Sequence, residues 1–255
     1  MGGFSKKKRI EVQRETIKHI EKNSRKYKSK SIKYPNYEPR YDKRWGKLNH
    51  KTVISVEPTD TLESVVQLIN DDYRSKIGFL VMANSTNKGG GYLRGTNGQE
   101  ESICRRTDLH NCFKGMKYPI PEFGTFFVQG VSIIRETEKE QYKFFEKPYK
   151  ACCVLSAAYH DPPADKNGRL TDGYRTKTKH KLEAVLNTFL EESCYNIVLG
   201  AYGCGAFGNP VKDIALIFKE LLESDKYKNT FQKVVFAVLK EAGGNNYNAF
   251  REIFK

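Results

Sequence analysis

The chain has 255 residues, a formal net charge of +14, and 38% hydrophobic and 29% charged residues. This length and composition fit one large globular domain or two small ones, and we expect one. The apolar runs are too short to cross a bilayer, and the start MGGFSKKKRI lacks an apolar signal segment. We therefore expect a protein that is not membrane-bound and not secreted, in the cytoplasm or nucleus.

The six cysteines are spread along the chain without any C-x-x-C pair. Paired cysteines at short spacing are what zinc sites and disulfide-rich secreted domains need, so neither class is indicated. We expect no metal and predict free, buried thiols at Cys104, Cys112, Cys152, Cys153, Cys194 and Cys204.

The positive charge is concentrated near the amino terminus. Residues 1–50 hold 16 Lys and Arg against 5 Asp and Glu, while the rest of the chain is close to neutral. Such a region can contact phosphate backbones without reading sequence, which makes nonspecific nucleic acid a candidate partner. The same charge fits an ordinary solvated surface equally well.

Within this region we predict a helix over residues 8–27, with Ile10, Ile17 and Ile20 on one side. Residues 28–49 interleave Lys, Arg and Pro with the aromatic residues Tyr34, Tyr37, Tyr41 and Trp45, which favours an irregular strap over the domain surface. Stacking of these rings on bases is the alternative. The predicted division of the chain is an amino-terminal helix and strap, 1–50, packed on a domain of residues 51–255.

From Thr52 onward, strands and helices alternate. Residues 53–56 read as a strand, and Asp60 is a candidate N-cap for a helix with Leu62, Val65, Val66 and Ile69 on one face. Residues 79–83 form a short apolar run that ends at Asn84, as a buried strand in an α/β sheet would.

Three glycines in a row, Gly89, Gly90 and Gly91, follow this strand. Without side chains they permit positive φ angles and allow another group to press against the backbone. Thr96 with Gln99, and Asn97 with Glu100, have the spacing of a capping box, so we predict a helix start that carries Glu100 and Glu101 in its first turn. A strand, a glycine loop and an acidic helix start together predict a ligand site.

The middle of the chain continues the same alternation. Residues 126–134, 151–156 and 196–201 predict strands, 136–150 a loop, 160–175 a turn-rich flap, and the spacing of Leu182 to Leu190 an amphipathic helix. His160 and His180 have no Ser/His/Asp or metal-ligand pattern around them, so we interpret both as surface residues.

A second glycine loop, Gly203 to Gly208, leads into a predicted helix with Asn209 as N-cap and Pro210 in the first position. Backbone N–H groups at such a helix start can hold a diphosphate. The loop also fits the G-x-G-x-x-G pattern of dinucleotide-binding folds. That pattern belongs in the first β-α turn and needs an acidic residue after the next strand, whereas here residues 234–239 are followed by Lys240 and Glu241. A helix near 249–254 ends the chain.

Two blocks, 84–101 and 200–210, resemble the microbial-type poly(ADP-ribose) glycohydrolases (PARGs). The first is Gly-Gly-Gly followed after seven residues by Gln-Glu-Glu, and the second resembles the diphosphate loop of that family. The resemblance extends from about residue 9 to the carboxyl terminus. It implies an α/β fold, a three-layer α/β/α macrodomain with a mixed central sheet and an amino-terminal helical extension.

By the same resemblance, the function is hydrolysis of the ribose–ribose O-glycosidic bonds of poly(ADP-ribose) from chain ends, by a monomer that needs no cofactor or metal. The alternatives are a hydrolase that removes single ADP-ribose units from protein or nucleic acid, and a macrodomain that only binds ADP-ribose. The partner is then poly(ADP-ribose) or an ADP-ribosylated macromolecule.

The resemblance also implies residue roles. Glu101 takes the leading catalytic role and Glu100 supports it, while Asp60 stands where macrodomains often hold an adenine-binding acid. Two positions depart from the family pattern: Lys88 stands where Pro is usual, and Gly208 where a larger polar residue is common. The full substrate-binding set is Asn84, Asn87, Gly89, Gly90, Gly91, Gln99, Gly203, Cys204, Gly205, Ala206, Phe207, Gly208 and Asp60.

Overall fold

Seven strands form one mixed sheet in the computed structural model, which describes residues 4–34, 36–37, 44–72, 74–240 and 245–255. The strand order is β1-β4-β5-β3-β6-β7-β2. The strands from β5 to β2 are parallel, whereas β4 runs antiparallel to both β5 and β1. Their bounds are β1 Lys30–Tyr34, β2 Val53–Glu57, β3 Ile77–Met82, β4 Thr125–Arg135, β5 Phe144–Ser156, β6 Asn196–Leu199 and β7 Lys233–Ala237.

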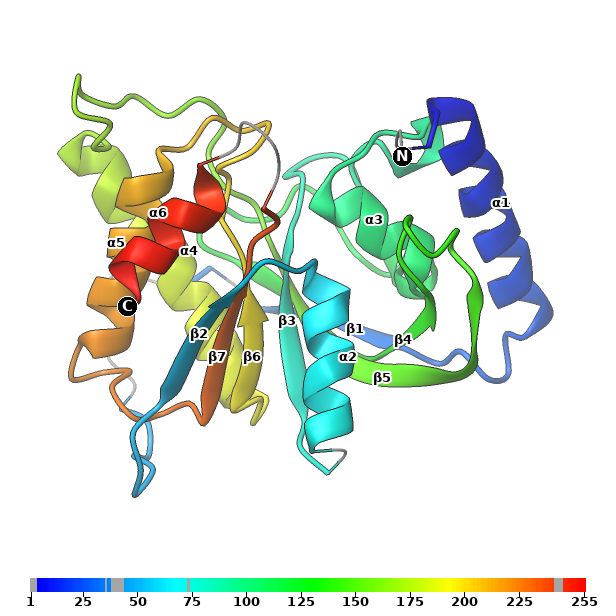
Figure 1. The fold of residues 1–255 in the computed structure, drawn as a ribbon, viewed down its shortest axis with the longest axis horizontal. Coiled ribbons are helices and arrows are strands. Elements are labelled where there is room, and N and C mark those ends of the chain that lie inside the picture. Colours follow the sequence, from blue (N-terminus) through cyan, green and yellow to red (C-terminus); the bar gives the residue numbers. More distant parts are fainter. Residues whose placement is uncertain (1–3, 35, 38–43, 73, 241–244) are drawn as a thin grey trace.

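Helices cover both faces of this sheet (Figure 1). On one side lie α4, α5 and α6, and on the other lie α2 and α3, with α1 outside α3. The sheet and its two helical layers confirm the predicted three-layer α/β/α macrodomain. The bounds are α1 Lys6–Lys22, α2 Thr61–Asp71, α3 Gln99–Arg106, α4 Asp172–Glu191, α5 Val211–Glu223 and α6 Asn246–Ile253, with short 3₁₀ helices η1 Tyr92–Arg94 and η2 Leu109–Lys114.

The core is divided by the sheet, and β3 lies at its centre. Phe79 and Val81 pack into the cluster under α2 and α3, while Leu80 packs into the cluster under α4 and α5. Because β3 is flanked by β5 and β6 and covered on both faces, almost every one of its residues is buried. This double burial explains the uninterrupted apolar run in the sequence.

Two sequence predictions at the sheet edge are wrong. Part of the predicted strap, residues 30–34, is the edge strand β1, and part of the predicted loop 136–150 belongs to β5 from Phe144 onward. Both segments are mostly exposed, and Ile32 on β1 is 42% exposed, so they lack the apolar alternation that reveals a half-buried strand. Tyr41 and Glu241 lie outside the described residues.

The amino-terminal helix is shorter than predicted, and of the predicted apolar residues Ile10, Ile17 and Ile20 only Ile20 is fully buried. Ser5 caps it, it ends at Lys22, and its buried residues are Val12, Gln13, Thr16 and Ile20. Gln13 and Thr16 are polar, and their side chains donate hydrogen bonds to the carbonyls of Cys104 and Arg105 at the end of α3, at 3.4 and 2.8 Å. Polar residues that pack through hydrogen bonds do not appear in an apolar periodicity.

Ion pairs add to this contact between the amino-terminal segment and the rest of the fold. Arg9 pairs with Glu138 at 2.9 Å, and Arg135 pairs with Glu15 at 2.7 Å. β1 is a strand of the common sheet, although the division of the chain at residue 50 remains a prediction.

None of the helices in the described ranges combines the length and apolar character needed to cross a membrane.

A prediction for the core concerns Gly78 on β3. A Cβ atom there would lie 2.7 Å from the buried ring of Phe189, so we expect Gly78→Ala to destabilise the fold by about 1–3 kcal/mol through overpacking. Gly173 on α4 has no described atom within 4 Å of the corresponding position, and Gly173→Ala should leave stability unchanged or raise it by up to about 1 kcal/mol. Urea unfolding of both variants measures the difference, and equal stability would contradict the packing argument.

Candidate functional site

The start of α3 is fixed to the carboxyl end of β3 by Gln99. Its Oε1 accepts a hydrogen bond from the backbone N–H of Met82 at 2.9 Å, and its Nε2 donates to the carbonyl of Leu80 at 2.7 Å and to the hydroxyl of Thr61 at 3.1 Å. Gln99 therefore ties α3 to β3 and to α2. We assign it a positioning role, and its contact with substrate remains a prediction.

Glu100 and Glu101 lie in the first turn of α3, as predicted, and each holds part of the glycine loop. Glu100 is 4% exposed, and its Oε2 accepts a hydrogen bond from the backbone N–H of Asn84 at 2.8 Å. Its Oε1 is buried and has no hydrogen-bond partner among the described residues. Glu101 is half-buried, and its Oε1 accepts from the N–H of Gly91 at 2.8 Å.

A glycine is needed at position 90 because these carboxylates press against the loop. Gly89 and Gly90 have φ angles of 72° and 59°, in the left-handed region. A Cβ atom on Gly90 would lie 2.5 Å from Glu101 Oε1 and 3.0 Å from Glu100 Oε2. The sequence predicts a close approach to the loop backbone, and part of that approach comes from the protein's own carboxylates.

The predicted caps of α3 are wrong. The N-cap is Gly98, and no side chain bonds the helix start there. Thr96 and Asn97 are instead held by the fully buried Arg105, whose guanidinium donates to the Thr96 carbonyl at 2.8 Å and to Asn97 Oδ1 at 3.2 Å. The capping-box spacing is present in the sequence, but the two glutamates turn toward the glycine loop, so the box does not close.

Burial determines the protonation of Glu100. Removal from water, with a smaller contribution from the charge of Glu101, raises the pKa of Glu100 to about 8, although the hydrogen bond from Asn84 acts in the opposite direction. Near neutral pH this carboxyl is therefore protonated. A buried carboxylic acid beside a second carboxyl group is a common arrangement for proton transfer.

The polar residues of the first loop mostly organise its backbone. Asn84 Oδ1 accepts from the N–H groups of Thr86 and Asn87, at 3.0 and 2.8 Å, which forms a tight turn. Lys88 donates to the Phe113 carbonyl at 2.7 Å and so fastens the loop to η2.

The second glycine loop is organised by Asn209. Its Nδ2 donates to the carbonyls of Tyr159, Phe207 and Gly203, at 2.7, 3.0 and 3.1 Å. The predicted N-cap role is wrong, because the amide turns back into the loop and α5 begins after Pro210 without a side-chain cap. The loop is held at its own ends, which leaves Gly205 and Ala206 exposed and Phe207 half-exposed.

The structure brings the two loops to the same edge of the sheet. β3 and β6 pair in parallel, so the segments that follow them leave side by side from their carboxyl ends. A Cβ atom on Gly200 would lie 3.3 Å from Met82 Cε, which shows how closely the loops begin. Ligands of open α/β sheets bind at this edge, between neighbouring loops.

Asp60 has the predicted capping role. It forms a full capping box with Glu63, and its other carboxylate oxygen accepts from Arg106 at 2.6 Å. Its contact with adenine remains a prediction. His160 is exposed and pairs with Asp161, as a surface histidine would, although its ring lies 5.3 Å from that of Phe207.

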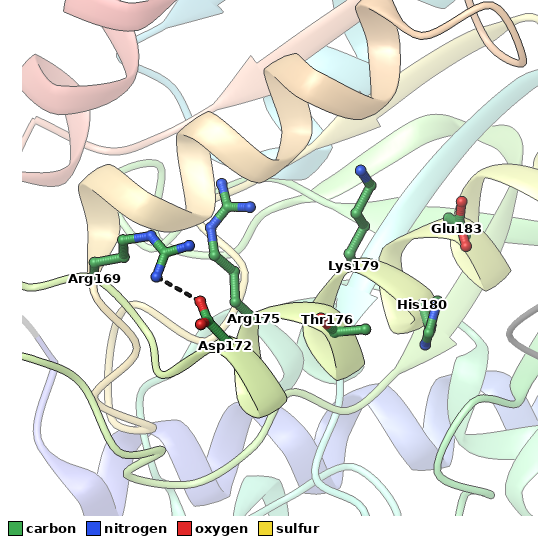
Figure 2. Close-up of a pocket in the computed structure, with 7 residues that line it drawn as sticks. All are labelled: Arg169, Asp172, Arg175, Thr176, Lys179, His180 and Glu183. Atoms are coloured by element: carbon green, nitrogen blue, oxygen red, sulfur yellow. Dashed lines mark hydrogen bonds and ion pairs between the residues drawn. The ribbon is translucent and has the colours of Figure 1, made fainter.

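A surface cavity of about 350 Å³ lies elsewhere, along α4 (Figure 2). Three of its basic side chains are already paired: Arg169 with Asp172 at 2.8 Å, Arg175 with Asp213 at 2.9 Å, and Lys179 with Glu220 at 3.8 Å. We assign it no part in the site. Its lining residues are Arg169, Asp172, Arg175, Thr176, Lys179, His180 and Glu183.

All six cysteines are free; Cys204 is partly buried and the other five are fully buried. Burial raises the pKa of the Cys204 thiol, which donates to the Tyr202 carbonyl at 3.6 Å, so it is not an activated nucleophile. Among the described residues, no group of three His, Cys, Asp or Glu side chains is placed to hold a metal ion.

The helices on both faces of the mixed sheet, with glycine loops at the carboxyl ends of two neighbouring parallel strands, define a macrodomain-type fold. Solved structures agree over nearly the whole chain. The PARG from Thermomonospora curvata superposes with a TM-score of 0.80 and 22% identity, covering 96% of this chain and 98% of that one. The same protein bound to the inhibitor ADP-HPD superposes with a TM-score of 0.76 and 21% identity, covering 96% of this chain and 98% of that one.

The T267K mutant of the PARG from Deinococcus radiodurans, in complex with ADP-ribose, gives a TM-score of 0.67 at 23% identity, covering 80% of this chain and 84% of that one. At these identities the structures establish the fold. Residues 3–121 match the family model of the microbial-type PARG catalytic domain, which confirms the resemblance to that family. A search of curated protein sequences finds no match. The second glycine loop lies outside the matched residues, so its role remains a prediction.

Stability should depend on pH through Glu100. Because its folded pKa of about 8 exceeds its ordinary value of 4.5, the folded state binds this proton more tightly than the unfolded chain. Its contribution is fully present below pH 4.5 and is lost as pH rises to about 8, at up to about 1.4 kcal/mol per pH unit. Glu100→Gln, which cannot titrate, should therefore lose less stability than the wild type between pH 5 and 8.5 in urea unfolding. Parallel pH profiles would show that Glu100 is not protonated in the fold.

Proposed function

We propose that the protein hydrolyses the ribose–ribose O-glycosidic bonds of poly(ADP-ribose) and releases ADP-ribose. The observation that carries this proposal is the carboxyl pair at the start of α3, one member protonated by burial and both held against the glycine loop. The family match over residues 3–121, together with related structures that contain ADP-ribose or ADP-HPD, supports it.

Glu101 is the member of the pair that is more accessible to a bound ribose, because Glu100 is almost fully buried. In the proposed reaction, protonated Glu101 donates its proton to the leaving ribose oxygen as the C1″–O bond breaks. The bonding electrons leave with that oxygen and an oxocarbenium ion remains. Glu101, now ionised, accepts a proton from the water that attacks C1″, so a single carboxyl serves both steps where many glycosidases use two.

The glycine loops would supply the remaining support. Gly89 to Gly91 and Gly203 to Gly208 lie at neighbouring strand ends, and exposed backbone at such positions can hold a diphosphate. A diphosphate folded between the loops brings negative charge near the oxocarbenium ion and stabilises it. Glu100, kept neutral, does not add a further negative charge next to the diphosphate.

The choice of substrate is tested directly. The purified protein is incubated with poly(ADP-ribose), with mono-ADP-ribosylated protein and with ADP-ribosylated DNA or RNA, and free ADP-ribose is measured. We expect release from the polymer. Release from a mono-ADP-ribosylated substrate alone would favour the alternative hydrolase, and binding of ADP-ribose without release would favour a reader.

We expect Glu101→Gln to lose at least about 10² to 10⁴ in rate, which is the usual contribution of general acid–base catalysis. Glu100→Gln should lose less or mainly weaken binding. Both amides keep an oxygen to accept the loop N–H groups, so both proteins should fold and still bind ADP-ribose by calorimetry. Hydrolysis by Glu101→Gln at close to the wild-type rate would refute the assignment.

Phe207 is the aromatic residue of the second loop, and we expect its ring to lie over the terminal ribose and block further polymer. Its carbonyl is already used by Asp161 and Asn209, so the ring can be removed while these loop contacts remain. Phe207→Ala should lower the polymer hydrolysis rate by about 10- to 100-fold through lost positioning. Gel analysis of wild-type products should show ADP-ribose, and release of long internal fragments would contradict cleavage from chain ends.

A further inference from the structure

A second cavity, of about 330 Å³, lies against the glycine loop and is here called the outer cavity. Gly90 and Gly91, which contact the carboxyl groups of α3, also form part of its wall. The outer cavity and the proposed catalytic pair therefore contact the same two residues of the glycine loop. Its lining residues are Thr86, Asn87, Lys88, Gly90, Gly91, Tyr92, Leu93 and Arg94.

The outer cavity combines an exposed apolar side chain with a free cation. Leu93, on the 3₁₀ helix η1, is 57% exposed, so its side chain is available for contact with a ligand. Arg94 is exposed as well, and no described carboxylate lies within ion-pair range of it. Lys88 also lines the cavity, but its ammonium is held by the Phe113 carbonyl, so Arg94 is the cation available to a ligand.

The amino-terminal helix adds further positive charge at this place. A Cβ atom on Gly95 would lie 2.3 Å from the Lys6 carbonyl oxygen, so the first turn of α1 abuts the end of η1. Lys6 and Lys7 are exposed and have no ion-pair partner among the described residues. A surface of unpaired cations thus continues from Arg94 onto α1.

We infer that the outer cavity and this cationic surface bind the next ADP-ribose unit of the polymer, the one attached through the leaving oxygen. The inference rests on the proposed function. The cavity is at the small end of ligand pockets, large enough for a nucleoside in contact with Leu93, while the diphosphate lies along Arg94, Lys6 and Lys7. Free ADP-ribose, which has no second unit, would not use this site.

The test separates polymer binding from ADP-ribose binding. In a Glu101→Gln background, which prevents turnover, Arg94→Ala should weaken the binding of poly(ADP-ribose) by about 10-fold, because a hydrogen-bonded charge contact is lost. The slope of log K against log salt should fall by about 1. The Kd for ADP-ribose should remain within about twofold, since one removed contact to the second unit leaves the first unit's site intact. The matched control is Arg251→Ala, an exposed arginine on α6 in the opposite helical layer.

Leu93→Ala provides an independent variant. It should weaken polymer binding without changing the salt slope, because it removes apolar contact and no charge. Leu216→Ala, at a position on α5 that is 39% exposed and outside the outer cavity, is its control. In the otherwise wild-type protein, Arg94→Ala should raise KM for polymer and leave kcat nearly unchanged.

Three results would overturn the inference. In the first, Arg94→Ala binds polymer as tightly as Arg251→Ala does. In the second, Arg94→Ala loses polymer binding and ADP-ribose binding equally, which would make Arg94 part of the loop structure. In the third, single-stranded RNA would compete with polymer in the wild type but not in Arg94→Ala while polymer affinity is unchanged, which would make the surface a nucleic-acid site. A wild-type protein that binds polymer through Arg94 but does not hydrolyse it would refute the proposed function alone.

Discussion

Three consecutive side chains at the start of α3 accept hydrogen bonds from the backbone of β3 and its loop. Gln99 accepts from Met82, Glu100 from Asn84 and Glu101 from Gly91. The N–H groups of a strand end and a tight loop must be satisfied once they are removed from water. In this fold the helix that carries the acidic residues satisfies them. The conformation of the glycine loop, the position of α3 and the orientation of its two carboxyl groups therefore depend on one another.

The basic amino-terminal region packs against the end of α3 and helps to hold this helix in place. α1 donates to the carbonyls of Cys104 and Arg105 at the end of α3, where helix carbonyls lack partners within the helix. The buried guanidinium of Arg105 then reaches forward to residues 96 and 97 of the glycine loop. The region that supplies most of the net positive charge thus also anchors α3, and the exposed Lys6 and Lys7 lie at the helix end that abuts η1.

The sequence predicts the structure well where the residue type at a position has only one physical explanation. The apolar run at 79–83 predicts β3 because both faces of that strand are buried. The three glycines predict a close approach because a Cβ atom on Gly90 would collide with the carboxylates, and one on Gly89 or Gly91 would collide with neighbouring side chains. It is much less informative where a polar side chain has several possible partners. Asn209 next to Pro210 looks like an N-cap, yet its amide serves three carbonyls of the loop instead.

Arg105 is a second residue whose partners cannot be predicted from the sequence. In the sequence it is one of two arginines at the end of a helix, a place where basic residues commonly face solvent and interact with the helix dipole. Only tertiary contacts reveal that it is fully buried and holds the glycine loop. The exposed strand β1 was hidden for a related reason, since its pairing with β4 depends on backbone groups that carry no side-chain signal.

The burial of Glu100 has an electrostatic consequence for binding. Two like charges about 4 Å apart repel by about 4 kcal/mol at an effective dielectric constant of 20. If both carboxyl groups were ionised, a diphosphate entering between the loops would meet that repulsion from each of them. Burial raises the pKa of Glu100 to about 8 and so keeps this carboxyl uncharged near neutral pH, while the acceptor oxygen that holds Asn84 is retained. The fold can therefore keep two carboxyl side chains beside the position proposed for the diphosphate, because Glu100 is neutral there.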